Sequence, residues 1–350
     1  MLVFMIILII VFYRLALKKK YNIPYLLLAV TCGAAGTIIR SLGMIISDPL
    51  IESITARLFF FFIGGLTVFF FFFEESCSSF KPSIPGVIAV ISLFIVSQIF
   101  NLYSLSNSLS TETAQEFRMI GLFFYGILGI ISFGYFGIKF YMKSYRLTRE
   151  KMALILTIGM IIGLIAYSLI AFSAIYFRGD IDINNPLGII VATLSPIMTA
   201  IFSLSYLFNI DYVYRLPHNY YLLMAFYKSG IQIYHAEIES NRNIKIESHL
   251  VSGFFTAVNS LFVESLSAET NVENISSSDA ALVIGSGEYI SVVVIGEKST
   301  SKLQDAVSSF VEDIEAKYGP LLQEHESNID KYRGIKDLIP ASFPFFKIKE

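Results

Sequence analysis

Long apolar segments fill the first 210 residues, and they restrict what the chain can fold into more than any other feature. Seven of them are long enough, or nearly so, to cross a hydrocarbon core about 30 Å thick, which takes about 17–25 helical residues. A segment in lipid must satisfy its own backbone hydrogen bonds, and a helix does so. The seven segments are residues 1–17, 23–46, 57–73, 86–104, 119–140, 152–177 and 187–209. The sequence therefore predicts a membrane-embedded, all-α seven-helix bundle over residues 1–210.

Composition separates this region from the rest of the chain. The chain is 55% hydrophobic, contains 32 Phe and has a mean hydropathy of +0.64, which lies outside the range of soluble globular proteins. Residues 1–210 contain 14 basic and 9 acidic residues, whereas residues 211–350 contain 12 and 19. The acidic second region offers no basic stripe for phosphates, which argues against nucleic acid as a partner. Cys32 and Cys77 are isolated and predict neither a disulfide nor a zinc site, so we expect no cofactor.

Basic residues between the segments predict the orientation of the bundle. Lys18–Lys20 follow the first segment, and Lys139 at the end of the fifth segment is followed by four more basic residues before the sixth. The loops on the opposite side contain only Arg118 and Arg178, with Arg57 at a helix start. Basic loops stay in the cytoplasm, so the N-terminus is expected outside and everything after residue 210 inside. The sequence predicts a multi-pass protein of the cell membrane, surrounded by lipid.

Several polar residues lie inside the apolar segments, toward their outer ends. Arg40 lies about two turns from the outer end of the second segment, and an intramembrane arginine is a candidate functional residue. Gln98, Tyr125, Tyr167 and Thr193 are expected in the same half of their own segments, where they would line an outward-open ligand pocket with Arg40. Alternatively, the Arg40 guanidinium extends to the interface and the others form hydrogen bonds between helices. The segments as delimited contain no carboxylate, so no proton relay is expected.

A change in pattern after residue 210 predicts a second domain. Residues 211–220 form a joint, residues 221–340 a folded domain, and residues 341–350 a Phe-rich tail. Short alternating or fully apolar runs predict strands at residues 221–227, 231–238, 272–277, 280–284 and 289–295. Helical spacing of apolar residues predicts helices at residues 248–262, 301–319 and 331–339. The result is an α/β domain of the α+β type with a five-stranded, mostly antiparallel sheet.

Glycines and polar residues add local expectations within this domain. Gly253 is expected to let the helix over residues 248–262 approach the sheet closely, and Gly285–Gly287 is expected to be the turn before the last strand. Asn259 and Glu264 would point away from the sheet, which makes them a candidate surface for a partner. The histidines are scattered and fit no metal-binding or catalytic motif, so we expect no enzymatic activity.

The order of elements in the second domain resembles the longin fold, a relative of roadblock domains. In that fold, a five-stranded sheet carries one helix on one face and the remaining helices on the other. The stretches that carry the resemblance are Tyr221–Ile238, Leu250–Phe262 and Asp279–Gly296, and the match covers about residues 217–340. They are similar to longin-like cytoplasmic modules of prokaryotic signalling proteins. The membrane region is similar in topology to the seven-helix sensor region that precedes some histidine kinases.

These features favour a membrane sensor or scaffold that acts in signal transduction through protein–protein interaction. The resemblance implies that the cytoplasmic domain binds a protein partner, either a small GTPase or a second copy of itself as a homodimer. The alternative function is a small-solute transporter or channel whose cytoplasmic domain is regulatory. A continuous polar path through the bundle would favour transport, and a closed polar pocket at one end would favour a sensor.

Overall fold

The structure is a computed structural model. It describes residues 23–46, 48–105, 110–176, 218–240, 273–277, 280–324 and 328–349, with isolated residues at 10–14, 190–208 and 253. The chain forms two compact units. The membrane unit contains Met1–Glu75 and Pro82–Ile210, and the sheet unit contains Ser76–Lys81 and Asp211–Glu350. Residues 76–81, which the sequence predicts as part of the bundle, therefore belong to the sheet unit instead.

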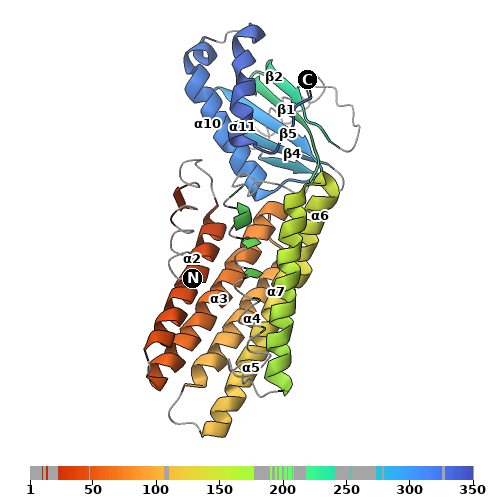
Figure 1. The fold of residues 1–350 in the computed structure, drawn as a ribbon. Coiled ribbons are helices and arrows are strands. Elements are labelled where there is room, and N and C mark those ends of the chain that lie inside the picture. The colour runs from red at the N-terminus through yellow and green to blue at the C-terminus, as the bar shows by residue number, and fades with distance from the viewer. Residues whose placement is uncertain are drawn as a thin grey trace, which may run out of the picture. The chain divides into compact units, whose positions relative to one another are not determined.

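The described part of the chain contains five helices that are long and apolar enough to cross a membrane, as in a membrane protein. They are Pro24–Gly43, Leu50–Ser78, Ile84–Tyr103, Thr111–Thr148 and Lys151–Tyr176. The prediction of seven is not matched by this count, because the segments predicted at residues 1–17 and 187–209 lie almost wholly outside the described residues. Figure 1 shows the helices of the membrane unit running side by side.

The helices of the membrane unit differ in length from the predicted segments. Their bounds are α2 Pro24–Ile45, α3 Pro49–Ser78, α4 Ile84–Tyr103, α5 Thr111–Gly129, η1 Ile130–Gly137, α6 Ile138–Thr148 and α7 Lys151–Tyr176. With 30 residues, α3 is about 45 Å long and exceeds the hydrocarbon thickness of about 30 Å. It therefore extends beyond the predicted range of 57–73 at both ends.

A stripe of glycines brings the long helix α5–η1–α6 against α7. A Cβ atom added at Gly126, Gly129, Gly134 or Gly137 would come within 3 Å of Ala171, Tyr167, Leu164 and Met160, respectively. Gly129 and Gly134 are five positions apart, and residues at this spacing do not lie on the same face of a regular α-helix. The η1 segment between them is a π-helix, whose wider turn returns the stripe to α7. Small residues thus set the close approach of these two helices.

The sheet unit is built on five strands, all of whose neighbours are antiparallel. The strands are β1 Tyr220–Tyr227, β2 Gln232–Glu237, β3 Asn274–Ser276, β4 Ala281–Ser286 and β5 Ile290–Gly296. Their order is β2-β1-β5-β4-β3, which confirms the predicted five-stranded, mostly antiparallel sheet. Every residue of the central strands β1 and β5 is buried, and Met224, Ile284 and Val293 lie in one core cluster. Such continuous apolar runs are typical of strands covered on both faces.

Helix α10 (Ser301–Gln323) lies on one face of this sheet (Figure 1). Gly285 allows the close approach, because a Cβ atom there would lie 2.8 Å from Cγ1 of Val307. Gly285 lies within β4, which ends at Ser286, so the turn predicted at Gly285–Gly287 begins only after Ser286. α10 was expected to end near Gly319–Pro320, yet it continues through Pro320, and Leu322 in its last turn is fully buried.

The predicted helix over residues 248–262 lies outside the described residues, except for Gly253. A Cβ atom added at Gly253 would meet nothing within 4 Å, so the close approach expected at this glycine is not found.

The C-terminal tail packs against the sheet unit. It follows the 3₁₀-helix η3 (Ile329–Leu338) and the short α11 (Ile339–Ser342). Phe343 is fully buried, with its ring centroid 5.2 Å from that of Phe310. Ile348 forms a β-bridge with Ile238, and backbone hydrogen bonds flank this bridge, so the tail covers the edge of the sheet beside β2.

Candidate functional site

Two of the predicted pocket residues meet in the interior of the membrane unit. The hydroxyl oxygens of Tyr125 and Tyr167 lie 3.3 Å apart, and that of Tyr167 lies 2.9 Å from Oγ1 of Thr67. Thr67 also donates to the carbonyl of Ile63 at 3.0 Å. A threonine hydroxyl has one hydrogen, so Thr67 accepts from Tyr167, which in turn accepts from Tyr125. The three buried side chains form one directed chain of hydrogen bonds across α5, α7 and α3.

Gln98 lies against the same stretch of α3 but has different partners. Its Nε2 atom is 3.3 Å from Oγ of Ser97, and it would lie 3.3 Å from a Cβ atom at Gly64. The ring of Tyr125 packs edge-to-face on Phe60, one turn before Gly64. Gln98, Tyr125 and Tyr167 therefore all contact α3 between residues 60 and 67.

Arg40 lies apart from this cluster. One of its terminal nitrogens is 3.6 Å from a carboxylate oxygen of Glu52, in the first turn of α3. The Arg40 side chain is 26% exposed and that of Glu52 58%, so the pair is at the surface end of these helices. Thr193, Asn259 and Glu264, the remaining predicted site residues, lie outside the described residues.

The sequence reasoning missed a buried carboxyl group at the other end of α3. Glu74 is 2% exposed and neither carboxyl oxygen has a hydrogen-bond partner. One of these oxygens would lie 3.1 Å from a Cβ atom at Gly137, so the carboxyl group packs on the end of the π-helix. The predicted apolar segment ends at residue 73, so Glu74 lies just outside it. Only the length of α3, which continues to Ser78, places Glu74 inside the helix.

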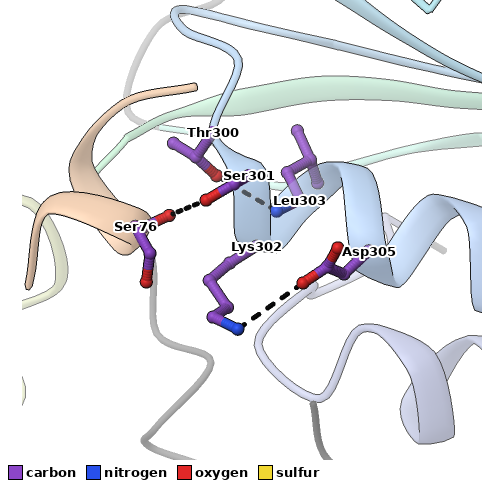
Figure 2. A network of polar contacts seen from close by, with 6 residues as sticks. All are labelled: Ser76, Thr300, Ser301, Lys302, Leu303 and Asp305. Atoms are coloured by element: carbon purple, nitrogen blue, oxygen red, sulfur yellow. Dashed lines mark hydrogen bonds and ion pairs between the residues drawn. The ribbon is translucent and has the colours of Figure 1, made fainter. Parts of the chain in front are cut away.

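The end of α3 forms a joint inside the sheet unit, drawn in Figure 2. The last four carbonyls of a helix and its first four N–H groups lack partners within the helix. Here the hydroxyl of Ser301, the first residue of α10, donates to the carbonyl of Ser76 at 3.0 Å. The Ser301 amide donates to the carbonyl of Ser79 at 3.3 Å. The two helix ends therefore satisfy each other, and their dipoles meet with opposite sign.

Further contacts hold Ser76–Lys81 in the sheet unit. Nε2 of His218 lies 3.0 Å from the carbonyl oxygen of Ser78, and this nitrogen must carry the hydrogen, because a carbonyl only accepts. Cys77 is fully buried in this segment. Tyr220 at the start of β1 is buried as well, and burial raises the pKa of its phenol. The joint is thus a hydrogen-bonded contact beside two buried side chains, Cys77 and Tyr220.

The first turn of α10 is itself well ordered. Oγ1 of Thr300 accepts from the amide of Leu303 at 3.1 Å, which is the usual N-terminal cap of a helix. Lys302 is 4% exposed, and its ammonium group lies 3.5 Å from a carboxylate oxygen of Asp305 one turn on (Figure 2). The carboxylate offsets the unfavourable placement of a positive charge at a helix N-terminus.

Among the described residues, no three His, Cys, Asp or Glu side chains are grouped so that they could hold a metal ion. No protein-family model, curated protein or solved structure matches the chain.

Proposed function

We propose that this protein is an integral membrane sensor or scaffold whose sheet unit binds a protein partner in the cytoplasm. The observation that carries the proposal is the joint between α3 and α10. α3 is one continuous helix that begins in the membrane unit and ends on the first turn of α10 in the sheet unit. A shift or rotation of α3 would therefore move the helix that covers the sheet. Helix shifts of this kind are a common means of transmitting a signal.

The sheet unit supports the second half of the proposal. Its five antiparallel strands and the position of α10 on one face are compatible with a longin-like domain. By that resemblance, the partner is a small GTPase or a second copy of the chain. The tail covers the edge at β2, so the short edge strand β3 and the surface around it are the better candidates for docking. The unit acts without catalysis in this proposal.

The interior of the membrane unit favours a sensor over a transporter. The hydroxyl chain at Thr67 and the carboxyl group of Glu74 are seven residues apart on α3, which is about 10 Å. Phe70, Phe71 and Phe133, all buried, lie between these levels, and the ring centroids of Phe70 and Phe133 are 6.1 Å apart. In the described residues, this aromatic layer interrupts any polar path along α3. The full proposal keeps seven helices with the N-terminus outside and the sheet unit inside.

Site-specific photocrosslinking in cells tests this function with the intact chain. A photoreactive residue at Ile231 or Ile329, each more than half exposed in the sheet unit, should form adducts with a soluble protein or a second copy. The matched control is Ile165, an exposed apolar residue of α7, which should form adducts with lipid. Adducts at Ile165 without any at the sheet-unit positions, together with solute flux in proteoliposomes, would overturn the proposal in favour of transport.

A further inference from the structure

Three polar side chains lie at one level of the membrane unit, and the first two of them come from α3 and α4. A Cβ atom at Gly64 would lie 2.7 Å from the ring of Phe94. The two helices are joined by five residues and run in opposite directions. Seven residues before Gly64 is Arg57, and seven after Phe94 is Asn101. Two turns separate each pair, so Arg57 and Asn101 lie at the same level.

The third side chain comes from α5. A Cβ atom at Gly121 would lie 3.0 Å from the backbone nitrogen and 3.1 Å from Cγ of Asn101. Arg118 is one turn before Gly121, and the neighbouring Phe117 stacks on Phe100 at 5.7 Å. Arg118 therefore lies on the turn of α5 beside Asn101. Arg57 and Arg118 therefore bring two positive charges to the level of Asn101, and like charges repel each other.

Two of these side chains, Asn101 and Arg57, have buried polar atoms without a hydrogen-bond partner among the described residues. Asn101 is 1% exposed, and neither its amide nitrogen nor its amide oxygen has a hydrogen-bond partner. Nε of Arg57 is buried and unpartnered, and no described acidic side chain forms an ion pair with Arg57. A buried amide without a partner is strongly unfavourable, and so is a buried guanidinium N–H that donates to nothing.

The acidic residues described near Arg57 do not serve as its counter-ion. Glu52 pairs with Arg40, and Glu112 and Glu116 are exposed on α5.

We propose that Arg57, Arg118 and Asn101 form a binding site for an oxyanion, that is, a carboxylate or phosphate group. Guanidinium groups bind such groups through paired N–H donors, and the Asn101 amide supplies another donor. The group would belong either to a dissolved solute or to the headgroup of an anionic lipid. The inference deepens the proposed function and rests on it in one respect: the oxyanion would be the ligand that the membrane unit detects.

Thermal unfolding of the full chain in lipid nanodiscs tests the site and separates the two sources. In phosphatidylcholine nanodiscs, sodium phosphate or sodium acetate is compared with sodium chloride at equal ionic strength. In a second arm, the nanodiscs contain phosphatidylglycerol and no added oxyanion. A ligand that binds only the folded state raises the unfolding temperature. A rise in the first arm indicates a dissolved oxyanion, and a rise only in the second indicates a lipid headgroup.

Variants show whether the rise comes from this site. Arg57→Gln should abolish it and, without oxyanion, should unfold at or above the temperature of the wild type, because it removes a repelled charge. Asn101→Leu should raise the half-maximal oxyanion concentration about tenfold. Arg146→Gln, a change at an exposed arginine of α6, should respond like the wild type.

Three results would overturn the proposal: no rise from either source, an equal rise in Arg57→Gln, or an Arg57→Gln protein less stable than the wild type without oxyanion. The first result leaves partner binding in the crosslinking experiment unaffected, so failure of the site and failure of the proposed function are distinguishable.

Discussion

The two units treat their buried polar groups differently. In the sheet unit, the hydroxyls of Tyr227 and Tyr332 lie 2.7 Å apart, and Glu315 accepts from the amide of Tyr289 at 2.8 Å. The unpartnered buried groups of the sheet unit include the hydroxyl of Tyr220 and the amide oxygen of Gln304, which are neutral, and the amide nitrogen of Gln304 donates to the carbonyl of Ile284 at 2.8 Å. In the membrane unit, the unpartnered groups include the carboxyl of Glu74, the guanidinium nitrogen of Arg57 and the whole amide of Asn101.

This difference separates stability from function. A neutral unpaired group costs about 1–3 kcal/mol, whereas an unpaired charge costs considerably more. A fold retains such groups inside a membrane chiefly where they bind or sense something. We therefore expect substitutions in the sheet unit to act on folding, and substitutions of the membrane unit's polar groups to act on binding with little loss of stability.

The largest effect should come from the core of the sheet unit. Phe310→Ala removes a fully buried ring that packs on Phe343, and the resulting cavity should cost about 3–5 kcal/mol. Hydrogen exchange of the β5 amides in the full chain measures the loss. Ser308→Ala, at an exposed position of the same helix, should change protection by less than about 0.5 kcal/mol. Equal effects of the two variants would contradict the packing of α10 on the sheet.

An intermediate effect is expected at the joint. Ser301→Ala removes the hydroxyl that donates to Ser76 and should weaken the contact by about 0.5–1.5 kcal/mol. Because Cys77 is fully buried there, its alkylation rate reports opening of the joint, in a background where Cys32 is replaced by serine. The rate should rise roughly 2- to 12-fold in proportion to that free energy. An unchanged rate, equal to that of Ser308→Ala, would remove the joint as a route of coupling.

The sheet could be predicted from the sequence because its signals are local. Alternating or continuous apolar runs reveal strands such as β1 and β5, and regular spacing reveals α10. Pro320 and Gly285 were misjudged because burial of Leu322 and close packing on Val307 overrule local preference there.

The candidate sites in the membrane unit were only partly predictable. Tyr125 and Tyr167, which the sequence analysis places in one candidate pocket, share a hydrogen bond, whereas Thr67, the partner of Tyr167, is not among the predicted residues. Asn101 and Glu74 acquire meaning only from the register between helices, which a single apolar pattern does not encode. An overlong helix can also extend past its apolar run, as α3 does.

A small effect on stability is expected at Glu74, in contrast to its neighbour. The carboxyl group of Glu74 has no hydrogen-bond partner, so it contributes no favourable polar contact to the fold. Glu74→Gln keeps the shape of the side chain and breaks no hydrogen bond, so it should change the unfolding free energy by less than about 0.5 kcal/mol. Glu75 instead accepts from the amide of Ser83 at 2.8 Å, so Glu75→Gln should cost about 0.5–1 kcal/mol. Thermal unfolding in nanodiscs compares the two variants, and a larger cost at Glu74 would show that its carboxyl group is charged and paired.

The smallest effect is expected at Arg40, the residue that first suggests a pocket in the sequence. Its pair with Glu52 is long, at 3.6 Å, and partly exposed, and such pairs contribute less than about 1 kcal/mol. Arg40→Leu should therefore insert and unfold like the wild type, and Glu52→Gln should behave in the same way. Arg40→Leu should also keep the oxyanion-dependent rise in unfolding temperature, because the proposed anion contacts are made by Arg57, Arg118 and Asn101. If Arg40→Leu abolishes that rise while Arg57→Gln retains it, the ligand lies at the Arg40–Glu52 end of α2 and α3. The contrast between the two units would survive that result, but the membrane unit's unpaired groups would then need a different explanation.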